Sequence, residues 1–276
     1  MLNLFRHEMR SRLGTILGWG IGLGMFGALY IGVWPEAGEA MQEIGDLAIY
    51  QAMGIDMTSF AGYMASVVVQ YVPLILGIYA ILASTGTLAG EEDSGTLELI
   101  VAAPLGRWQI VTVKAIALSL VVFLMIVVAA ILDVLVLNAI RGLTEVDVTS
   151  SELFMAMIGT WPLVVAFTMM GLFLGAYLPS RRAAALTLSV IFIASYFGLI
   201  LVGFAESLEP LKPMFLFNYL NSTASVFIEG QKPEDVAILL GLAMLFFGLA
   251  LLSFQRRNVT VRAWPWQRAR VGAKST

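Results

Sequence analysis

The chain has 276 residues, of which 59% are hydrophobic and 13% are charged, and its formal net charge is -3. Soluble domains are about 45–50% apolar and about 25% charged, so this composition excludes an ordinary soluble protein and predicts an all-α polytopic membrane protein. The absence of cysteine excludes disulfides and thiolate metal sites, the single histidine argues against a histidine metal centre, and the small net charge indicates no nucleic-acid partner.

Six apolar segments are long enough to cross a membrane as helices. We expect the spans at residues 15–34, 64–88, 115–137, 153–178, 183–205 and 236–254. Neither a soluble domain nor an internal repeat separates them, so residues 1–276 are expected to form a single transmembrane domain.

The segment before the first span mixes apolar residues such as Phe5 with Arg6, Arg10 and Arg12. This pattern predicts a short helix at the cytoplasmic interface, although plain positive flanking of the span explains the arginines equally well. The first span has full helix length and no A-x-A-like site follows it, so we interpret it as an uncleaved span rather than a signal peptide.

Lysine and arginine side chains predict the orientation of the spans. Most of them fall before span 1, after spans 2 and 4, and after span 6, whereas the loops on the opposite side contain only Arg141, Lys212 and Lys232. Both termini are therefore expected in the cytoplasm.

Small residues recur every four positions in the first span, including Gly20 and Gly24. This spacing lets helices approach closely in lipid. The stripe is either an interface with another subunit or a packing surface within the chain.

Polar groups within the spans are the candidates for a transport pathway. Asp133 carries the formal charge of the third expected span, and Gln70 and Tyr71 lie in the second. A carboxylate in a membrane is costly and indicates a functional role, but ordinary helix packing explains Gln70 and Tyr71 as well.

The segment before the last span, residues 206–235, combines three prolines with a dense apolar run over residues 214–220. It is too apolar for a free loop and too short to cross a membrane. We expect an apolar helical element here that dips into the outer leaflet.

Motifs for catalysis are missing from the sequence. It contains neither the P-loop pattern G-x-x-x-x-G-K-[ST] nor H-E-x-x-H. The chain is therefore not expected to be an enzyme or to bind ATP through a P-loop of its own, and we expect no catalytic, cofactor-binding or metal-binding residues in it.

The loop between spans 2 and 3 contains a short amphipathic element. Pro104 limits it, and Leu97, Ile100 and Val101 share one helical face. A helix of about two turns is not stable alone in water, so it must pack on something. The three acids at its start disfavour the anionic inner leaflet and favour a groove on a protein partner.

The same loop carries the pattern E-E-x-x-G-T-L-E-x-x-x-x-x-P-x-x-R-x-x-I-x-x-x-K, which resembles the inner loop of ABC-2 type transporter permeases. The matching residues are Glu91, Glu92, Gly95, Thr96, Leu97, Glu98, Pro104, Arg107, Ile110 and Lys114. The six spans, the N-terminal segment and the outer element are also similar to this family, so the likeness covers essentially the whole chain.

The resemblance implies that this loop is a coupling helix that inserts into a cleft of a separate ATP-binding subunit. The stripe that begins at Leu97 would be the docking face, and the acids would contact basic or polar groups of that subunit. The implied coupling residues are Glu91, Glu92, Gly95, Thr96, Leu97, Glu98, Ile100, Val101, Pro104 and Arg107.

The resemblance also implies the function, which is that of the permease subunit of an ATP-driven exporter in a prokaryotic plasma (inner) membrane. The expected partners are two copies of the ATP-binding subunit, which would hold ATP and Mg²⁺, a second permease copy or a paralogue, and membrane lipids. Few polar groups occur in the spans, which favours a hydrophobic or amphiphilic cargo.

The alternative is an ion- or proton-coupled secondary carrier that uses Asp133. Such a carrier predicts several buried charges and internally repeated halves. The sequence shows one charge within the expected spans and no clear repeat.

Overall fold

A computed structural model describes residues 1–45, 57, 59–87, 106–204 and 206–256. Secondary structure in these ranges is helical, with no strand. Six of the helical segments are long and apolar enough to cross a membrane. They are Leu13–Gly38, Phe60–Thr85, Arg107–Ile140, Ser150–Tyr177, Arg181–Phe204 and Pro233–Gln255. The prediction of an all-α polytopic protein with six spans is confirmed.

The N-terminal helix α1 (Leu2–Ser11) leads almost directly into the first span, α2 (Leu13–Gly45). The expected end of this span, residue 34, is not the end of the helix, since α2 continues through Pro35. Proline removes one helical hydrogen bond and crowds the carbonyl four residues earlier, yet the helix extends through it and past the apolar segment.

The second span has three parts, α4 (Phe60–Met64), the π-helical turn η1 (Ala65–Val69) and α5 (Gln70–Thr85). Pro73 lies in the first turn of α5. It lacks the N–H that would bond to the carbonyl of Val69, so the backbone is irregular where α5 begins.

The third span, α8 (Arg107–Ile140), is unbroken, whereas the fourth is divided into α9 (Ser150–Ile158) and α10 (Trp161–Tyr177). The sequence predicts one span over residues 153–178, with Pro162 as a kinking residue. The break follows from Pro162, which occupies the first turn of α10, the place where a helix tolerates a missing N–H.

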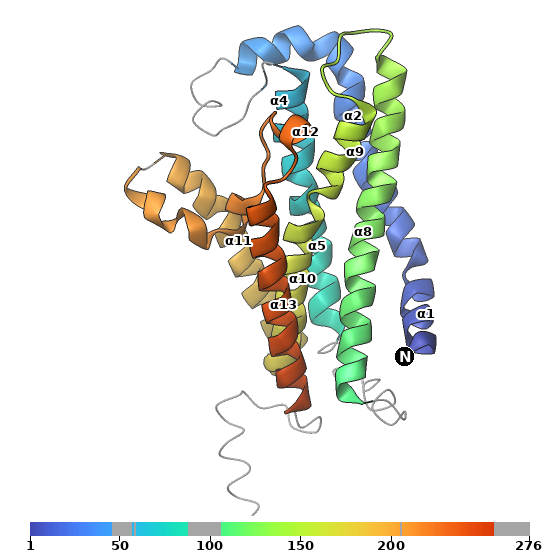
Figure 1. Ribbon diagram of the computed structural model, residues 1–276, viewed down its shortest axis with the longest axis vertical. Helices are drawn as coiled ribbons and strands as arrows, with labels where there is room; N and C mark the ends of the chain where they lie inside the picture. The colour runs from blue at the N-terminus through green and yellow to red at the C-terminus, as the bar shows by residue number, and fades with distance from the viewer. Residues whose placement is uncertain (46–56, 58, 88–105, 205, 257–276) are drawn as a thin grey trace, which may run out of the picture.

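The fifth span is α11 (Arg181–Phe204), and the last is α13 (Pro233–Gln255). The helical element expected between them consists of η3 (Glu206–Met214), η4 (Leu216–Tyr219) and α12 (Val226–Glu229). η3 and η4 are 3-10 helices, and η3 contains two prolines and projects from one side of the bundle in Figure 1. The Ser195 hydroxyl of α11 accepts a hydrogen bond from the Leu216 nitrogen at 2.7 Å, which ties this element to the fifth span.

One end of the bundle collects α1, the end of α5, the start of α8 and the end of α13 (Figure 1). We call this end the base. Among the spans, α2 packs along α8, and α10 packs between α5 and α13. These packed spans, rather than the outer element, supply most of the buried apolar side chains in the described ranges.

The glycines of α2 lie on two different faces. A Cβ on Gly20 would lie 2.7 Å from the Val128 Cβ, and one on Gly24 would lie 2.6 Å from Leu132 Cδ1, so both glycines pack tightly against α8. A Cβ on Gly18 or Gly22 would meet nothing within 4 Å. We call the contact of the first face with α8 the glycine seam, and this seam lies within the chain.

Alanine at position 24 tests the seam. Gly24→Ala should lower the free energy of unfolding by about 1–3 kcal/mol, because the added methyl group overpacks against α8. The measurement is the thermal-unfolding midpoint of the purified protein in detergent. Gly22→Ala is the matched control, since it adds the same methyl group two residues away in open space. Equal losses in the two variants would contradict the tight packing at Gly24.

Candidate functional site

The predicted coupling residues Glu91, Glu92, Gly95, Thr96, Leu97, Glu98, Ile100, Val101 and Pro104 lie outside the described residues. The structure does describe the helices that enter and leave this segment, because α5 ends at Thr85 and α8 begins at Arg107. Both ends lie at the base. The site is therefore built from the side chains that hold these two helix ends in place.

A buried ion pair joins α1 to α8 at the base. The Lys114 Nζ donates to Glu8 Oε1 at 2.8 Å, and the Lys114 side chain has no exposed surface. On the same carboxylate, Oε2 accepts hydrogen bonds from Arg12 Nε at 3.3 Å and Arg12 Nη2 at 3.2 Å. One carboxylate thus holds two cations from different helices.

The ion pair is needed because its charges are buried, and it is not a surface contact. An ammonium group removed from water is expensive unless an anion and hydrogen bonds replace the lost solvent. Arg12 also interacts electrostatically with the Tyr79 side chain of α5. The three side chains around Glu8 therefore bring α1, α5 and α8 together, and α5 and α8 are the helices on either side of residues 88–105.

The protonation of Glu8 reflects this setting. Burial alone would raise its pKa, but the adjacent charges of Lys114 and Arg12 hold the pKa below its ordinary value of 4.5. Glu8 is therefore ionised at neutral pH, and the pair is intact there.

Two arginines cover helix ends at the base. Arg107 Nη1 donates to the Gln255 carbonyl of α13 at 3.5 Å, and Arg181 Nη2 donates to the Leu82 carbonyl of α5 at 3.4 Å. The last carbonyls of a helix have no partner within it and carry partial negative charge, so a guanidinium there is favourable. These contacts fasten the ends of α5 and α13 to the starts of α11 and α8.

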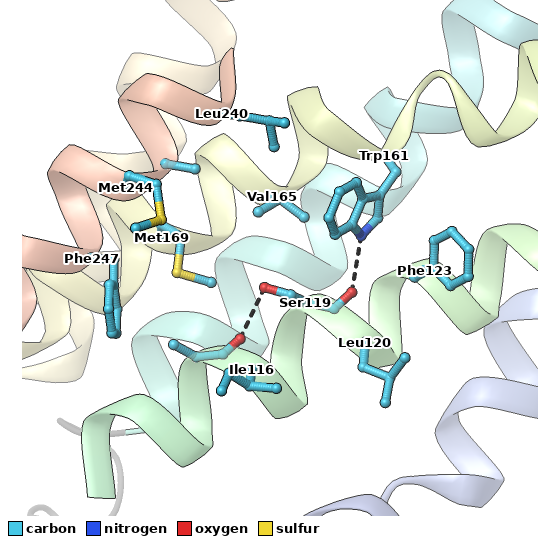
Figure 2. A pocket seen from close by; sticks show the side chains of 12 residues that line it. Ile116, Ser119, Leu120, Phe123, Trp161, Val165, Met169, Leu240, Met244 and Phe247 are labelled. Carbon is cyan, nitrogen blue, oxygen red and sulfur yellow. Dashed lines mark hydrogen bonds between the residues drawn. The ribbon is translucent and has the colours of Figure 1, made fainter. Parts of the chain in front are cut away.

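An apolar groove of about 630 Å³ opens between α8, α10 and α13 at the middle of the spans (Figure 2). Its walls include Ile116 and Phe123 of α8, Met169 of α10, and Leu240 and Met244 of α13. The groove therefore offers apolar surface within the depth of the membrane.

The polar atoms in the groove are already bonded. The Ser119 hydroxyl donates to the Ala115 carbonyl at 2.9 Å, and the indole nitrogen of Trp161 donates to the Ser119 carbonyl at 3.0 Å. Both bonds are drawn in Figure 2. Because these polar groups already have hydrogen-bond partners, the groove suits an apolar ligand, such as a hydrocarbon chain, better than a polar molecule.

The family of the chain follows from a comparison with known sequences. The family model described as ABC-2 family transporter protein matches residues 2–259. The chain belongs to this family. A comparison with curated proteins gives no match. ABC-2 family proteins are membrane transport domains rather than ATPases, and they work with an ABC ATP-binding partner, so the chain is a multi-pass membrane permease. Membership favours this function over the ion-coupled carrier that the sequence left open.

The other predicted residues of this ABC-2 protein lie apart from the groove. Gln70 and Tyr71 interact with Tyr196 of α11 at the start of α5. Gly20 lies in the glycine seam, as does Gly24, and Asp133 lies on α8 beside that seam. The structure therefore does not bring the predicted polar residues together as one lining.

Two features of the ABC-2 protein were missed from the sequence. Lys114 was assigned to the loop before the third span, but it is a fully buried residue of α8, and its partner Glu8 was not considered. The sequence does contain a signal for this ion pair, which is one acid in a basic N-terminal segment and one lysine at the border of an apolar run. The groove was missed because its walls come from three spans that are distant in sequence.

Neutralising Glu8 tests the ion pair. Glu8→Gln should cost about 3–5 kcal/mol, because it removes the carboxylate charge that faces the buried Lys114 ammonium. The midpoint of thermal unfolding in detergent at neutral pH measures the loss. Arg10→Gln is the control on the same helix, since Arg10 is exposed. A loss no larger than that of the control would show that the pair does not hold α1 in place.

The pH dependence of the same comparison has a defined sign. A carboxylate whose pKa is lowered by folding stabilises the protein above its ordinary value, here 4.5, and that contribution fades as the pH falls through the lowered value. The wild type and Glu8→Gln should therefore converge in stability below that range. A difference that persists unchanged in acid would contradict the role of the Glu8 charge.

Proposed function

We propose that this chain is the permease subunit of an ATP-driven exporter that moves a hydrophobic or amphiphilic molecule and couples to a separate ATP-binding subunit through residues 91–107. The observation that carries this proposal is the ion pair of Glu8 with Lys114, together with the electrostatic interaction of Arg12 with Tyr79. These contacts fix both helices that border the coupling segment to the N-terminal helix.

Coupling follows from the rigidity of the base. A movement imposed on residues 91–107 reaches α8 at Arg107, whose guanidinium also contacts the end of α13. The buried pair at Lys114 passes the movement to α1, and α1 leads into α2. A push on one short segment therefore acts on several spans at once, because a buried ion pair joins α8 to α1 and a hydrogen bond joins the start of α8 to the end of α13.

Docking itself is proposed to use the apolar stripe of Leu97, Ile100 and Val101, with Glu91, Glu92 and Glu98 meeting basic or polar groups on the partner. Two copies of the ATP-binding subunit would bind ATP and Mg²⁺, so this chain needs no cofactor. A second permease copy or a paralogue completes the assembly within the lipid bilayer. The base and both termini face the cytoplasm of a prokaryotic cell.

The cargo class is supported by the apolar groove. It lies between spans, has no unsatisfied polar group among its drawn side chains, and has the size of a small-molecule site. An acyl chain or another apolar moiety would enter it from the membrane without losing hydrogen bonds.

Charged substitutions in the stripe test the docking. In co-expression with an ATP-binding subunit, Leu97→Asp and Ile100→Asp should abolish copurification of the two chains, because each places a carboxylate in an apolar contact. The measurement is the ratio of the two chains after affinity purification.

The matched control is Leu143→Asp, which makes the same change at an exposed leucine at the opposite end of α8. It should leave the ratio of the two chains unchanged. Normal copurification and ATP hydrolysis with both Leu97→Asp and Ile100→Asp would refute coupling through this segment.

Filling the groove tests the cargo class. Leu240→Trp should raise by roughly tenfold the concentration of a lipophilic dye that half-maximally stimulates ATP hydrolysis by the complex, a loss of about 1.4 kcal/mol in binding. Val190→Trp is the control, because Val190 is exposed on α11 and does not line the groove. If the dye concentration needed for half-maximal stimulation is the same in the two variants, the groove is not part of the cargo path.

A further inference from the structure

Asp133 is a buried carboxyl group that neither the packing nor the proposed coupling uses. It lies on α8 about two turns before the helix ends at Ile140. Its exposed fraction is 0%, and neither carboxyl oxygen has a hydrogen-bond partner in the described part of the chain. A Cβ built on Gly27 of α2 would collide with both oxygens, so the carboxyl group is pressed against α2 at the outer end of the glycine seam.

An ionised carboxylate in this position is strongly unfavourable. Removing a charge from water without a partner costs far more than a protein of ordinary stability can supply, so such groups become neutral or acquire a counter-ion. The same chain meets this requirement for Lys114 by pairing it with Glu8. At Asp133 the described residues offer no equivalent cation.

No charged or titratable group in the described ranges donates a hydrogen bond to Asp133. Glu152 of α9 instead binds the nitrogen of Thr149, and Arg141 at the end of α8 donates to the Val148 carbonyl at 2.9 Å. The other titratable groups on the elements that contact α8 are Tyr30, Glu36, Glu39 and Glu43 of α2, Tyr71 and Tyr79 of α5, Tyr177 of α10, Glu234 and Asp235 of α13, and the residues of α1.

A metal ion does not fit this carboxyl group. Hard cations require several oxygen ligands around one point, and the described residues contain no group of three His, Cys, Asp or Glu side chains able to hold a metal ion. A proton needs only the carboxyl group. The ligand that fits this site is therefore a proton.

We propose that Asp133 is a proton-binding site that controls the glycine seam. With the proton bound, the neutral acid fits between α8 and Gly27, and the seam is closed as the structure shows it. When the proton leaves, the carboxylate requires water, and only a loosened seam admits water. The equilibrium is Asp133–COOH ⇌ Asp133–COO⁻ + H⁺, with the closed seam on the acid side.

The seam joins the first and third spans, so this site acts on the contact between them. The role proposed for Asp133 does not depend on how the permease docks its ATP-binding subunit. Asp133 lies in the outer half of α8, whereas Lys114 lies near the base. Loss of coupling through residues 91–107 would leave the proposal for Asp133 unaffected.

Infrared spectroscopy tests the protonation directly. At neutral pH the wild-type chain in lipid nanodiscs should show the carbonyl band of a protonated carboxylic acid, and Asp133→Asn should lack it. Every other acid is present in both chains and cancels, so the difference spectrum isolates this residue. Identical spectra of the two chains in the acid band would overturn the proposal.

Cysteine chemistry tests the opening of the seam. The chain contains no natural cysteine, so Ala129→Cys introduces a single thiol beside Gly24 in the seam. The rate at which this thiol reacts with a small water-soluble thiol reagent is measured in the wild-type and Asp133→Asn backgrounds. Thiol reactivity rises with pH in both backgrounds, so this rise cancels in the ratio of the two rates.

The rate ratio between the two backgrounds should increase on the order of tenfold as the pH rises from about 6 to about 10, because only the chain with Asp133 can ionise in the seam. A constant ratio over this range would overturn the control of the seam. Gel filtration of each variant confirms that the compared chains are folded.

Discussion

The burial of the Lys114 ammonium is the constraint on which the base depends. A cation inside a membrane protein must find an anion, and the anion is Glu8 of α1. Helix α1 continues into α2, and α2 packs along α8. The ion pair therefore adds a second connection between the first and third spans. The ends of α5 and α13 are held by Arg181 and Arg107 at the same level.

Helix α8 presents two faces with different chemistry. One face receives the glycines of α2 so closely that a single methyl group has no room, and the other forms a wall of the apolar groove with α10 and α13. A displacement of α8 at its first turn therefore changes the seam and the groove together. The arrangement gives an ABC-2 permease a physical route from its base to the middle of the membrane.

The sequence was sufficient for the architecture because hydropathy and backbone hydrogen bonding leave little choice in lipid: an apolar segment of spanning length must be a helix. Contacts between distant segments were harder to predict. Lys114 was taken for a loop residue because charge normally indicates exposure, and its partner lies 106 residues away. The split of the fourth span depends on local backbone geometry around Pro162, which hydropathy does not register. The coupling residues 91–104 remain predictions from the sequence pattern.

The wide separation of Glu8 and Lys114 along the chain also bears on descent. Removing Glu8 takes the carboxylate away from the buried Lys114 ammonium, whereas removing Lys114 leaves Glu8 with Arg12 alone, so a change at one position costs stability. Positions 8 and 114 are therefore expected to change together. An exchange of N-terminal segments between related permeases should succeed only where the recipient carries the matching residue in its third span.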